Sequence, residues 1–222
     1  MFCIPIIASK MEEAIRKMDL AAKVGDFLEV RLDLIESFDI PRLIKGAEKP
    51  IIITYRSVME GGMGKDSPES VADHLLSAVE YGADFVDVEL SMPLEIKNKI
   101  LAAGGTSKFI ISTHILAGTP SGVELEKILR ESIEAGGDIV KIVTMAREWE
   151  DNFRILELIT RAKTEDVKII SFCMGALGRM SRVFSVLMGA YMTFASLEAG
   201  QESAYGQIPI DKMKEITGLF ST

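Results

Sequence analysis

The chain has 222 residues, a length that suits a single α/β domain. Its hydrophobic content of 48% and charged content of 26% are ordinary for a globular protein and allow a sizeable core. The formal net charge of -8 argues against nucleic acid or an anionic membrane surface as the main partner, because both attract basic surfaces.

Short β-rich runs alternate with amphipathic helical runs along the whole chain. Eight runs are predicted as strands: Cys3–Ser9, Phe27–Asp33, Ile51–Arg56, Phe85–Leu90, Lys108–Thr113, Ile139–Thr144, Lys168–Cys173 and Tyr191–Ser196. Helices are predicted at Met11–Lys23, Pro68–Tyr81, Pro93–Ala103, Gly122–Ala135, Trp149–Lys163, Gly178–Met188 and Ile210–Phe220. Only Ile35–Ala47, which Pro41 interrupts, is ambiguous. Eight alternating units predict one α/β domain over residues 1–222, a (β/α)8 TIM barrel without a linker.

Some classes of protein are disfavoured by the sequence. No apolar run approaches the roughly 20 residues that a membrane span requires, so we expect a cytoplasmic protein. Cys3 and Cys173 lie inside apolar runs and are predicted to be buried thiols in a reducing compartment. No Gly-x-Gly-x-x-Gly turn follows the first strand, which argues against a dinucleotide cofactor.

A weak internal repeat relates three of the predicted strands. Val24–Leu32, Gly82–Leu90 and Gly137–Val143 share a glycine that ends a helix, an aspartate that opens the strand and side chains that alternate between two faces. One face is apolar and is predicted to contact the helices. The face directed into the barrel carries Glu29, Arg31, Asp87, Glu89 and Lys141. Because alternate strands supply side chains to shared layers of a barrel interior, we expect these polar residues to meet.

Lys141 stands alone as a charged residue in the middle of an otherwise apolar strand. A parallel strand in an α/β protein is covered on both faces, and burial disfavours the ammonium form of a lysine. Burial can therefore lower the pKa of Lys141, unless its side chain reaches water at the edge of the sheet. A neutral amine near pH 7 is the nucleophile that Schiff-base chemistry on a carbonyl requires.

Further reactive side chains stand near the carboxyl ends of neighbouring strands, where barrel enzymes build their sites. Arg56 ends the third predicted strand, and His114 follows the fifth. An imine on Lys141 is an electron sink, so an adjacent carbon can lose a proton to His114, with Glu89 orienting the imidazole. An arginine offers a planar fork for a carboxylate. These residues predict a Schiff-base lyase, either a dehydratase or an aldolase.

Seven short motifs run in order along the chain. They are Glu29-Val30-Arg31-Leu32-Asp33, Thr54-Tyr55-Arg56-Ser57, Asp87-Val88-Glu89, Ser112-Thr113-His114, Val140-Lys141-Ile142, Met174-Gly175 with Gly178 and Ser181-Arg182, and Ser203-Ala204-Tyr205-Gly206-Gln207. In this order they resemble the motifs of the type I 3-dehydroquinate dehydratases, and the last is similar to that family's lid. The resemblance runs from Ser9 to Gln207, nearly the whole chain.

The resemblance implies dehydration of 3-dehydroquinate to 3-dehydroshikimate in the shikimate pathway, without a metal or a cofactor. By position, Lys141 matches the imine-forming lysine, His114 the general acid and base, and Glu89 the carboxylate that supports the histidine. The positions that match substrate contacts are Glu29, Arg31 and Arg56 for ring hydroxyls, Arg182, Ser203 and Gln207 for the substrate carboxylate, Ser9 for a further contact, and Met174 and Phe194 for apolar walls. A homodimer is also implied, with the apolar helix at Val183–Met192 as one candidate surface.

Two positions depart from the family pattern. His114 is followed by Ile115-Leu116, where an acidic and an aromatic residue are expected, and Tyr205 stands where the lid usually has proline. Because proline restricts φ and lowers the entropy lost on closure, tyrosine there predicts a looser lid. The lid is expected within a mobile loop at about residues 197–208.

Two other functions fit part of the pattern. An aldolase acting on a sugar phosphate needs glycine amides as a phosphate cradle, and Met174–Gly178 offers part of one. A barrel that binds a small anion without catalysis needs neither a neutral Lys141 nor an adjacent His114. The paired arginines and the lid residues Ser203 and Gln207 favour a carboxylated, polyhydroxylated ring over a sugar phosphate.

Overall fold

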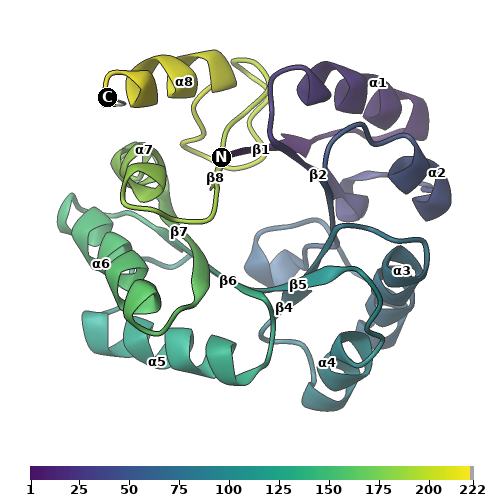
Figure 1. Cartoon of the computed structure of the whole chain (residues 1–222), viewed down its shortest axis with the longest axis horizontal. Coiled ribbons are helices and arrows are strands. Elements are labelled where there is room, and N and C mark those ends of the chain that lie inside the picture. The colour runs from purple at the N-terminus through teal and green to yellow at the C-terminus, as the bar shows by residue number, and fades with distance from the viewer. Residues whose placement is uncertain (221–222) are drawn as a thin grey trace.

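In the computed structural model, which describes residues 1–220, eight parallel strands surround a common axis (Figure 1). They are β1 (Phe2–Ile6), β2 (Phe27–Arg31), β3 (Ile51–Thr54), β4 (Phe85–Glu89), β5 (Lys108–Ile115), β6 (Ile139–Met145), β7 (Lys168–Met174) and β8 (Thr193–Phe194). Hydrogen-bonded neighbours follow the order β7-β6-β5-β4-β3-β2-β1-β8. The N–H of Tyr191, just before β8, donates to the carbonyl of Ile169 in β7 at 2.7 Å and joins the two ends of the sheet. The predicted (β/α)8 barrel is confirmed.

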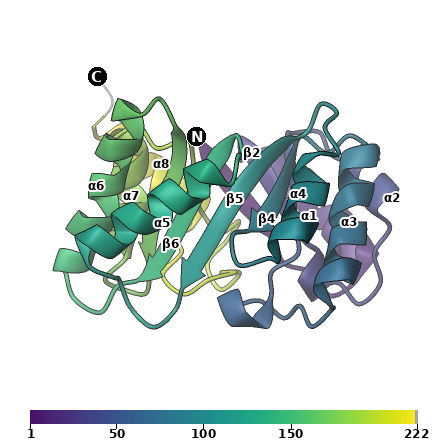
Figure 2. The same cartoon turned by 90° about the horizontal axis from the view of Figure 1, so that it is seen from below.

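Helices follow the strands and cover the outside of the barrel. They are α1 (Met11–Ala22), α2 (Ile40–Lys45), α3 (Pro68–Glu80), α4 (Leu94–Leu101), α5 (Gly122–Glu134), α6 (Glu150–Thr164), α7 (Arg179–Leu187) and α8 (Ile210–Gly218), with 3-10 turns η1 (Leu32–Leu34) and η2 (Val58–Glu60). Figure 2 shows α5 and α6 on one side of the strands and α3 and α4 on the other. None of these helices, within residues 1–220, is long and apolar enough to cross a membrane.

The ambiguous region at residues 35–47 forms the short helix α2. Asp39 is its N-cap and accepts a hydrogen bond from the N–H of Arg42 at 3.0 Å. Pro41 lies in the first turn, where its missing N–H costs no intrahelical hydrogen bond. The proline therefore starts this helix instead of breaking it.

The internal repeat has a structural cause at the amino-terminal end of the barrel. Asp26, Asp84 and Asp138 open β2, β4 and β6, and each carboxylate accepts a backbone N–H from the start of the preceding strand. The donors are Phe2, Ile51 and Phe109, at 2.7, 2.9 and 2.8 Å. Each aspartate thus pairs an N–H that the sheet leaves free and ties one strand to the next.

The two faces of the strands carry different residues, as the alternation predicts. The outward residues, such as Leu28 and Val30, pack in the main core with the helices. The lower layer inside the barrel is apolar and consists of Cys3, Phe27, Ile52, Phe85, Ile110, Ile139 and Ile170. The next inward positions are the buried polar residues Glu29, Asp87 and Lys141. Because the apolar layer fills the barrel beneath them, their charged ends lie toward its carboxyl end.

The last strand differs most from the prediction. A strand was expected over Tyr191–Ser196, but only Thr193 and Phe194 pair with β1. The N–H of Ala195 still donates to the carbonyl of Cys3 in β1 at 3.0 Å, and Ser196 then forms a bridge with Pro209, the residue before α8. This bridge joins the two ends of the segment at residues 197–208 at the base of a loop.

Candidate active site

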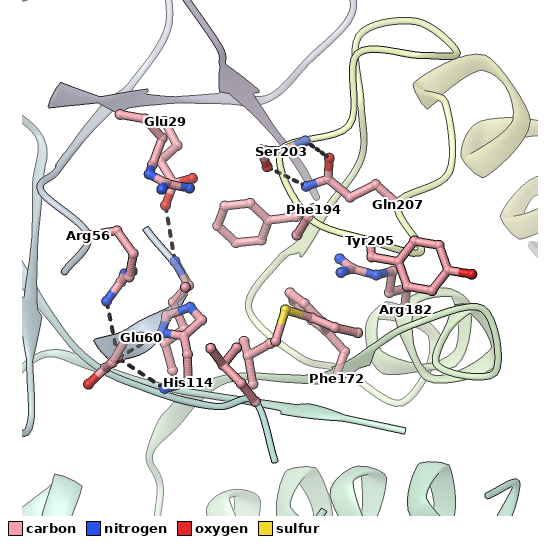
Figure 3. A pocket seen from close by; sticks show the side chains of 17 residues that line it. Glu29, Arg56, Glu60, His114, Phe172, Arg182, Phe194, Ser203, Tyr205 and Gln207 are labelled. Atoms are coloured by element: carbon pink, nitrogen blue, oxygen red, sulfur yellow. Dashed lines mark hydrogen bonds and ion pairs between the residues drawn. The ribbon is translucent and has the colours of Figure 1, made fainter. Parts of the chain in front are cut away.

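A cavity of about 240 Å³ opens at the carboxyl ends of the strands (Figure 3). In this view Glu29, Arg56, Glu60 and His114 lie on one side, and Arg182, Ser203, Tyr205 and Gln207 lie on the other, with Phe194 between them. The cavity brings together the following predicted residues: Lys141, His114, Glu29, Arg31, Arg56, Arg182, Ser203, Gln207, Met174 and Phe194. Their positions follow from strand alternation and from the loops that leave β3, β7 and β8.

Lys141 is buried in the middle of β6, and two carboxylates hold its ammonium group. Nζ donates to Glu29 Oε1 and to Asp87 Oδ2, both at 3.0 Å, and lies 4.5 Å from the ring centroid of Phe194. Burial alone would lower the pKa of Lys141, but the two carboxylates outweigh it and raise this pKa. The lowering that burial alone would cause is therefore reversed, and the pattern of one strand does not show which carboxylates face the lysine.

Arg56 links the acidic residues of the neighbouring strands. Nη2 donates to Asp87 at 2.7 Å, and Nη1 lies 3.0 Å from Glu89, 2.9 Å from the Ser112 hydroxyl and 3.3 Å from Glu60. Burial alone would raise the pKa of Asp87, but the Arg56 guanidinium and the nearby lysine ammonium hold it well below its usual range. Arg56 thus links β4, β5 and η2 through its hydrogen bonds, and it also lines the cavity.

Glu60 is the hydrogen-bond partner of the histidine. Its Oε2 lies 3.0 Å from His114 Nδ1 and also accepts the backbone N–H of His114 at 3.0 Å. Glu89, predicted for this role, accepts instead from Arg56 and from the N–H of Ser57 at 2.9 Å, and does not line the cavity. In this structure Glu60, and not Glu89, contacts the histidine, because Arg56 and Ser57 engage the carboxylate at the end of β4. The catalytic role of Glu89 stays a prediction.

The pKa values of these two groups move in opposite directions. Burial, followed by the charges of Arg56 and Lys141, lowers the pKa of His114 well below its usual range, so the imidazole is neutral at pH 7. Burial also raises the pKa of Glu60 to about 7. A neutral imidazole that donates Nδ1–H to Glu60 keeps Nε2 as its basic atom.

Arg182 is a buried cation without a hydrogen-bond partner in the described part of the chain. Its side chain is in α7, the residue is 1% exposed, and none of its three guanidinium nitrogens has a partner among residues 1–220. The guanidinium lies 4.4 Å from the ring centroid of Phe172. Burial lowers the pKa of Arg182 to about 9, which leaves the group charged at pH 7. An unpaired buried charge is costly, so this arrangement favours an anion in the cavity.

The loop from Ser203 to Gln207 covers the side of the cavity that Arg182 lines. The N–H of Ser203 donates to Gln207 Oε1 at 2.8 Å, and Gln207 Nε2 donates to the Ser203 hydroxyl at 2.9 Å. The N–H of Gly175, after β7, donates to the carbonyl of Tyr205 at 2.9 Å. Gly206 has a φ of +88°, and a Cβ there would lie 2.1 Å from the carbonyl oxygen of Gly175. Only glycine allows this approach to the end of β7.

Ser9 is the predicted substrate contact that the structure places outside the cavity. It is exposed in the segment between β1 and α1. Its N–H donates to Glu13 at 3.2 Å, and its carbonyl accepts from the N–H of Glu36 at 3.0 Å. The backbone of Ser9 therefore joins the start of α1 to the turn after β2, which explains its position away from the cavity.

Comparisons with known proteins agree with this geometry. A family model described as type I 3-dehydroquinase matches residues 2–222. The chain belongs to the type I 3-dehydroquinase family. The 3-dehydroquinate dehydratase of Methanocaldococcus jannaschii is 37% identical over 99% of this chain and 98% of its own length.

Solved structures of two 3-dehydroquinate dehydratases are similar over most of their length. The 3-dehydroquinate dehydratase of Geobacillus kaustophilus has a TM-score of 0.88 and 28% identity, and covers 99% of this chain and 90% of its own. The type I enzyme of Clostridium difficile, solved with covalently modified comenic acid, has a TM-score of 0.90 and 27% identity, and covers 99% of this chain and 91% of its own.

The sequence pattern of this type I 3-dehydroquinase did not single out Glu60. The residue lies in a glycine-rich loop, which predicts mobility more readily than a fixed carboxylate. One signal was available: Glu60 stands four residues after Arg56, and one turn brings the two side chains to 3.3 Å. The departure after His114 has a plain consequence, since Leu116 adds an apolar side chain to the cavity wall.

Proposed function

We propose that this chain dehydrates 3-dehydroquinate to 3-dehydroshikimate, a step of the shikimate pathway, through an imine on Lys141. The proposal is carried by one observation, the presence in one cavity of a buried lysine, a neutral histidine and an unpartnered arginine. The lysine supplies the nucleophile and His114 moves protons. Arg182, with Ser203 and Gln207 beside it, offers a site for the substrate carboxylate. The names of the relatives support the same substrate.

The reaction follows from the properties of these groups. The deprotonated Nζ of Lys141 attacks the ketone carbon; the hydroxyl so formed takes up the proton that the ammonium gave up and leaves as water, which gives the protonated imine. Nε2 of His114 takes a proton from the carbon next to the imine, and the electron pair forms an enamine. The enamine then expels the β-hydroxyl, which receives the proton from His114 and leaves as water. A second water hydrolyses the imine and frees the product and Lys141.

Activation of Lys141 is linked to substrate binding in this proposal. Glu29 and Asp87 raise the pKa of Lys141, so the ammonium must lose a proton before it attacks. A substrate hydroxyl that binds Glu29 weakens one of these two ion pairs. The positive charge of Arg56, which already acts to lower the pKa of Lys141, then favours the neutral amine.

A sugar-phosphate aldolase fits this cavity less well. Its phosphate needs free backbone amides in the segment Met174–Gly178. The N–H of Gly175 instead donates to Tyr205 at 2.9 Å, and the N–H of Gly178 donates to the carbonyl of Gly175 at 3.1 Å. With these two glycine amides engaged, the buried guanidinium of Arg182 is the better anion site, and its planar fork suits a carboxylate.

Trapping with borohydride tests the proposal. The protein is incubated with 3-dehydroquinate and borohydride, and its intact mass and peptides are measured. We expect a reduced adduct on the peptide that carries Lys141, together with dehydration followed by ultraviolet absorbance. Dehydration without an adduct rejects the imine mechanism. Absence of both rejects the function and leaves an aldolase or a barrel that only binds an anion.

The raised pKa of Glu60 predicts a pH dependence. Above about pH 7 the Glu60 carboxylate is ionised and accepts Nδ1–H of His114; below it, protonation removes the negative charge and weakens this hydrogen bond. We expect kcat/KM to be constant above the pKa and to fall about tenfold per pH unit below it. Glu60→Gln should remove this acidic limb and lower kcat about tenfold to a hundredfold at pH 8. An unchanged limb in the variant would assign the titration to another group.

The close approach of Gly206 to Gly175 predicts a role for the lid in substrate binding. Gly206→Ala is expected to raise the KM for 3-dehydroquinate about tenfold or more, with a smaller effect on kcat, since its Cβ would separate Ser203 and Gln207 from Arg182. Gly200→Ala is the matched control, because Gly200 has a φ of +82° but no atom within 4 Å of the added Cβ. Equal KM values for the two variants would show that backbone strain alone, and not the contact, matters.

We also propose that the loop at residues 197–208 is mobile and closes over the substrate, and that it closes less tightly with Tyr205 than it would with proline. Tyr205 is 69% exposed and its side chain lines the rim of the cavity. Limited proteolysis with and without product measures closure directly. We expect cleavage between Gly200 and Gln207 to slow when product is bound, and equal cleavage rates would contradict a closing lid.

A homodimer and a cytoplasmic location remain predictions. In the helix named as a candidate surface, Val183 is buried in the monomer, whereas Phe184 and Leu187 are each 37% exposed. Sedimentation velocity measures the oligomeric state, and Phe184→Glu is expected to weaken a dimer that uses this helix.

A further inference from the structure

Asp33 is a buried carboxylate that lies just behind the cavity wall. It follows β2 in the turn η1, and its side chain is fully buried. Oδ1 accepts from Arg31 Nε at 2.7 Å and from the backbone N–H of Arg56 at 3.2 Å. Oδ2 accepts from Arg31 Nη2 at 2.7 Å and from the backbone N–H of Met63 at 3.0 Å. Each oxygen thus receives one guanidinium donor and one backbone donor.

These four donors belong to two different parts of the site. Arg31 lines the cavity, and the bidentate pair with Asp33 fixes the plane of its guanidinium. The N–H groups of Arg56 and Met63 lie at the two ends of the loop that carries Glu60. Glu60 in turn contacts both the ring and the backbone N–H of His114.

We propose that Asp33 is a positioning residue. It holds both the Arg31 guanidinium and the loop at residues 56–63, which carries Glu60, and so couples substrate binding by Arg31 to the orientation of His114. The inference rests on the proposed function for its kinetic part. Asp33 touches neither the cavity nor the imidazole, so it acts through the groups that it holds.

Asp33→Asn is the informative variant because a carboxamide has the same shape. One oxygen is replaced by an NH2 group, and in either orientation that NH2 faces two N–H donors, one from Arg31 and one from the backbone. A buried donor without an acceptor is costly, so the side chain and the loop must shift apart. The change therefore reaches both the substrate side and the histidine side of the cavity.

A matched control exists at the other end of the barrel. Asp84 also accepts a backbone N–H at the start of a strand, that of Ile51 at 2.9 Å. Its carboxamide retains this hydrogen bond through the remaining oxygen, so Asp84→Asn is expected to keep kcat and KM within about twofold of the wild type. The two variants remove the same charge, from a buried side chain with four donors at Asp33 and from an exposed residue at Asp84.

The first readout is kinetic. We expect Asp33→Asn to raise the KM for 3-dehydroquinate about tenfold or more, and also to lower kcat, because Arg31 and His114 are both displaced. If Asp33→Asn changed KM but not kcat, Asp33 would act through Arg31 alone, and the proposed coupling to His114 would be wrong. If the wild-type protein showed no dehydratase activity, the proposed function would be rejected, and the kinetic comparison would fall with it.

The second readout does not depend on turnover. The chain has 2 histidines, so nitrogen-15 NMR of the imidazoles is easily assigned with His74→Gln. We expect His114 to carry its proton on Nδ1 in the wild type and in Asp84→Asn, and to lose this preference in Asp33→Asn. An unchanged His114 spectrum in Asp33→Asn would overturn the proposal even if activity were lost.

A double variant guards against failure to fold. Asp33→Asn leaves the Arg31 guanidinium buried without its partner, whereas Arg31→Met with Asp33→Asn removes that charge as well. Comparison of this double variant with Arg31→Met alone isolates the effect of Asp33 on the Glu60 loop. We expect the His114 signals to differ between the two, and identical signals would show that Asp33 acts on Arg31 alone.

Discussion

Replacing Arg182 by methionine is expected to stabilise the protein while it abolishes tight binding of substrate. The guanidinium is buried and has no hydrogen-bond partner among residues 1–220, so its removal takes away an uncompensated charge. We expect the free energy of unfolding to rise by about 1–4 kcal/mol, measured by urea denaturation. We expect the KM for 3-dehydroquinate to rise by about 10²-fold or more, because two charged hydrogen bonds to a carboxylate are lost.

The neighbouring arginine provides the control for this experiment. Arg179 lies one turn earlier in α7, is exposed and does not line the cavity. Arg179→Met is expected to change both stability and KM little, since exposed charges contribute little to either. If Arg182→Met destabilised the fold and left KM unchanged, the arginine would be a structural residue and the carboxylate site would lie elsewhere.

Replacing Lys141 by methionine is expected to abolish turnover. Loss of the nucleophile should lower kcat by at least about 10⁴-fold, which corresponds to about 5 kcal/mol of transition-state stabilisation. The borohydride adduct should disappear with it. The variant should also be less stable, because Glu29 and Asp87 lose their shared cation and remain buried.

A second buried lysine gives the matched comparison. Lys97 in α4 is 6% exposed, and its Nζ donates to the carbonyl of Leu90 at 2.9 Å. Burial lowers the pKa of Lys97, whereas the pKa of Lys141 is raised. Lys97→Met is expected to retain turnover and the adduct. If Lys97→Met abolished the adduct and Lys141→Met kept it, the assignment of the nucleophile would be wrong.

The fold was largely available from the sequence because its signals are local. Glycine and aspartate mark the start of β2, β4 and β6, and strand alternation places Glu29, Asp87 and Lys141 inside the barrel. The errors arise where non-local pairing decides the structure. β8 is short because Ser196 pairs with Pro209, and this contact between distant parts of the chain has no local pattern.

The same distinction applies to the site. Residue types and the period of the strands determined that a lysine, a histidine and two arginines face one end of a barrel, which indicates Schiff-base chemistry. Only the tertiary structure decided which groups meet: Glu60 and not Glu89 at His114, two carboxylates at Lys141, and, within residues 1–220, no hydrogen-bond partner at Arg182. The physical reason is that pKa values and hydrogen bonds depend on atoms a few ångströms apart in space, contributed by strands and loops that lie far apart in the chain.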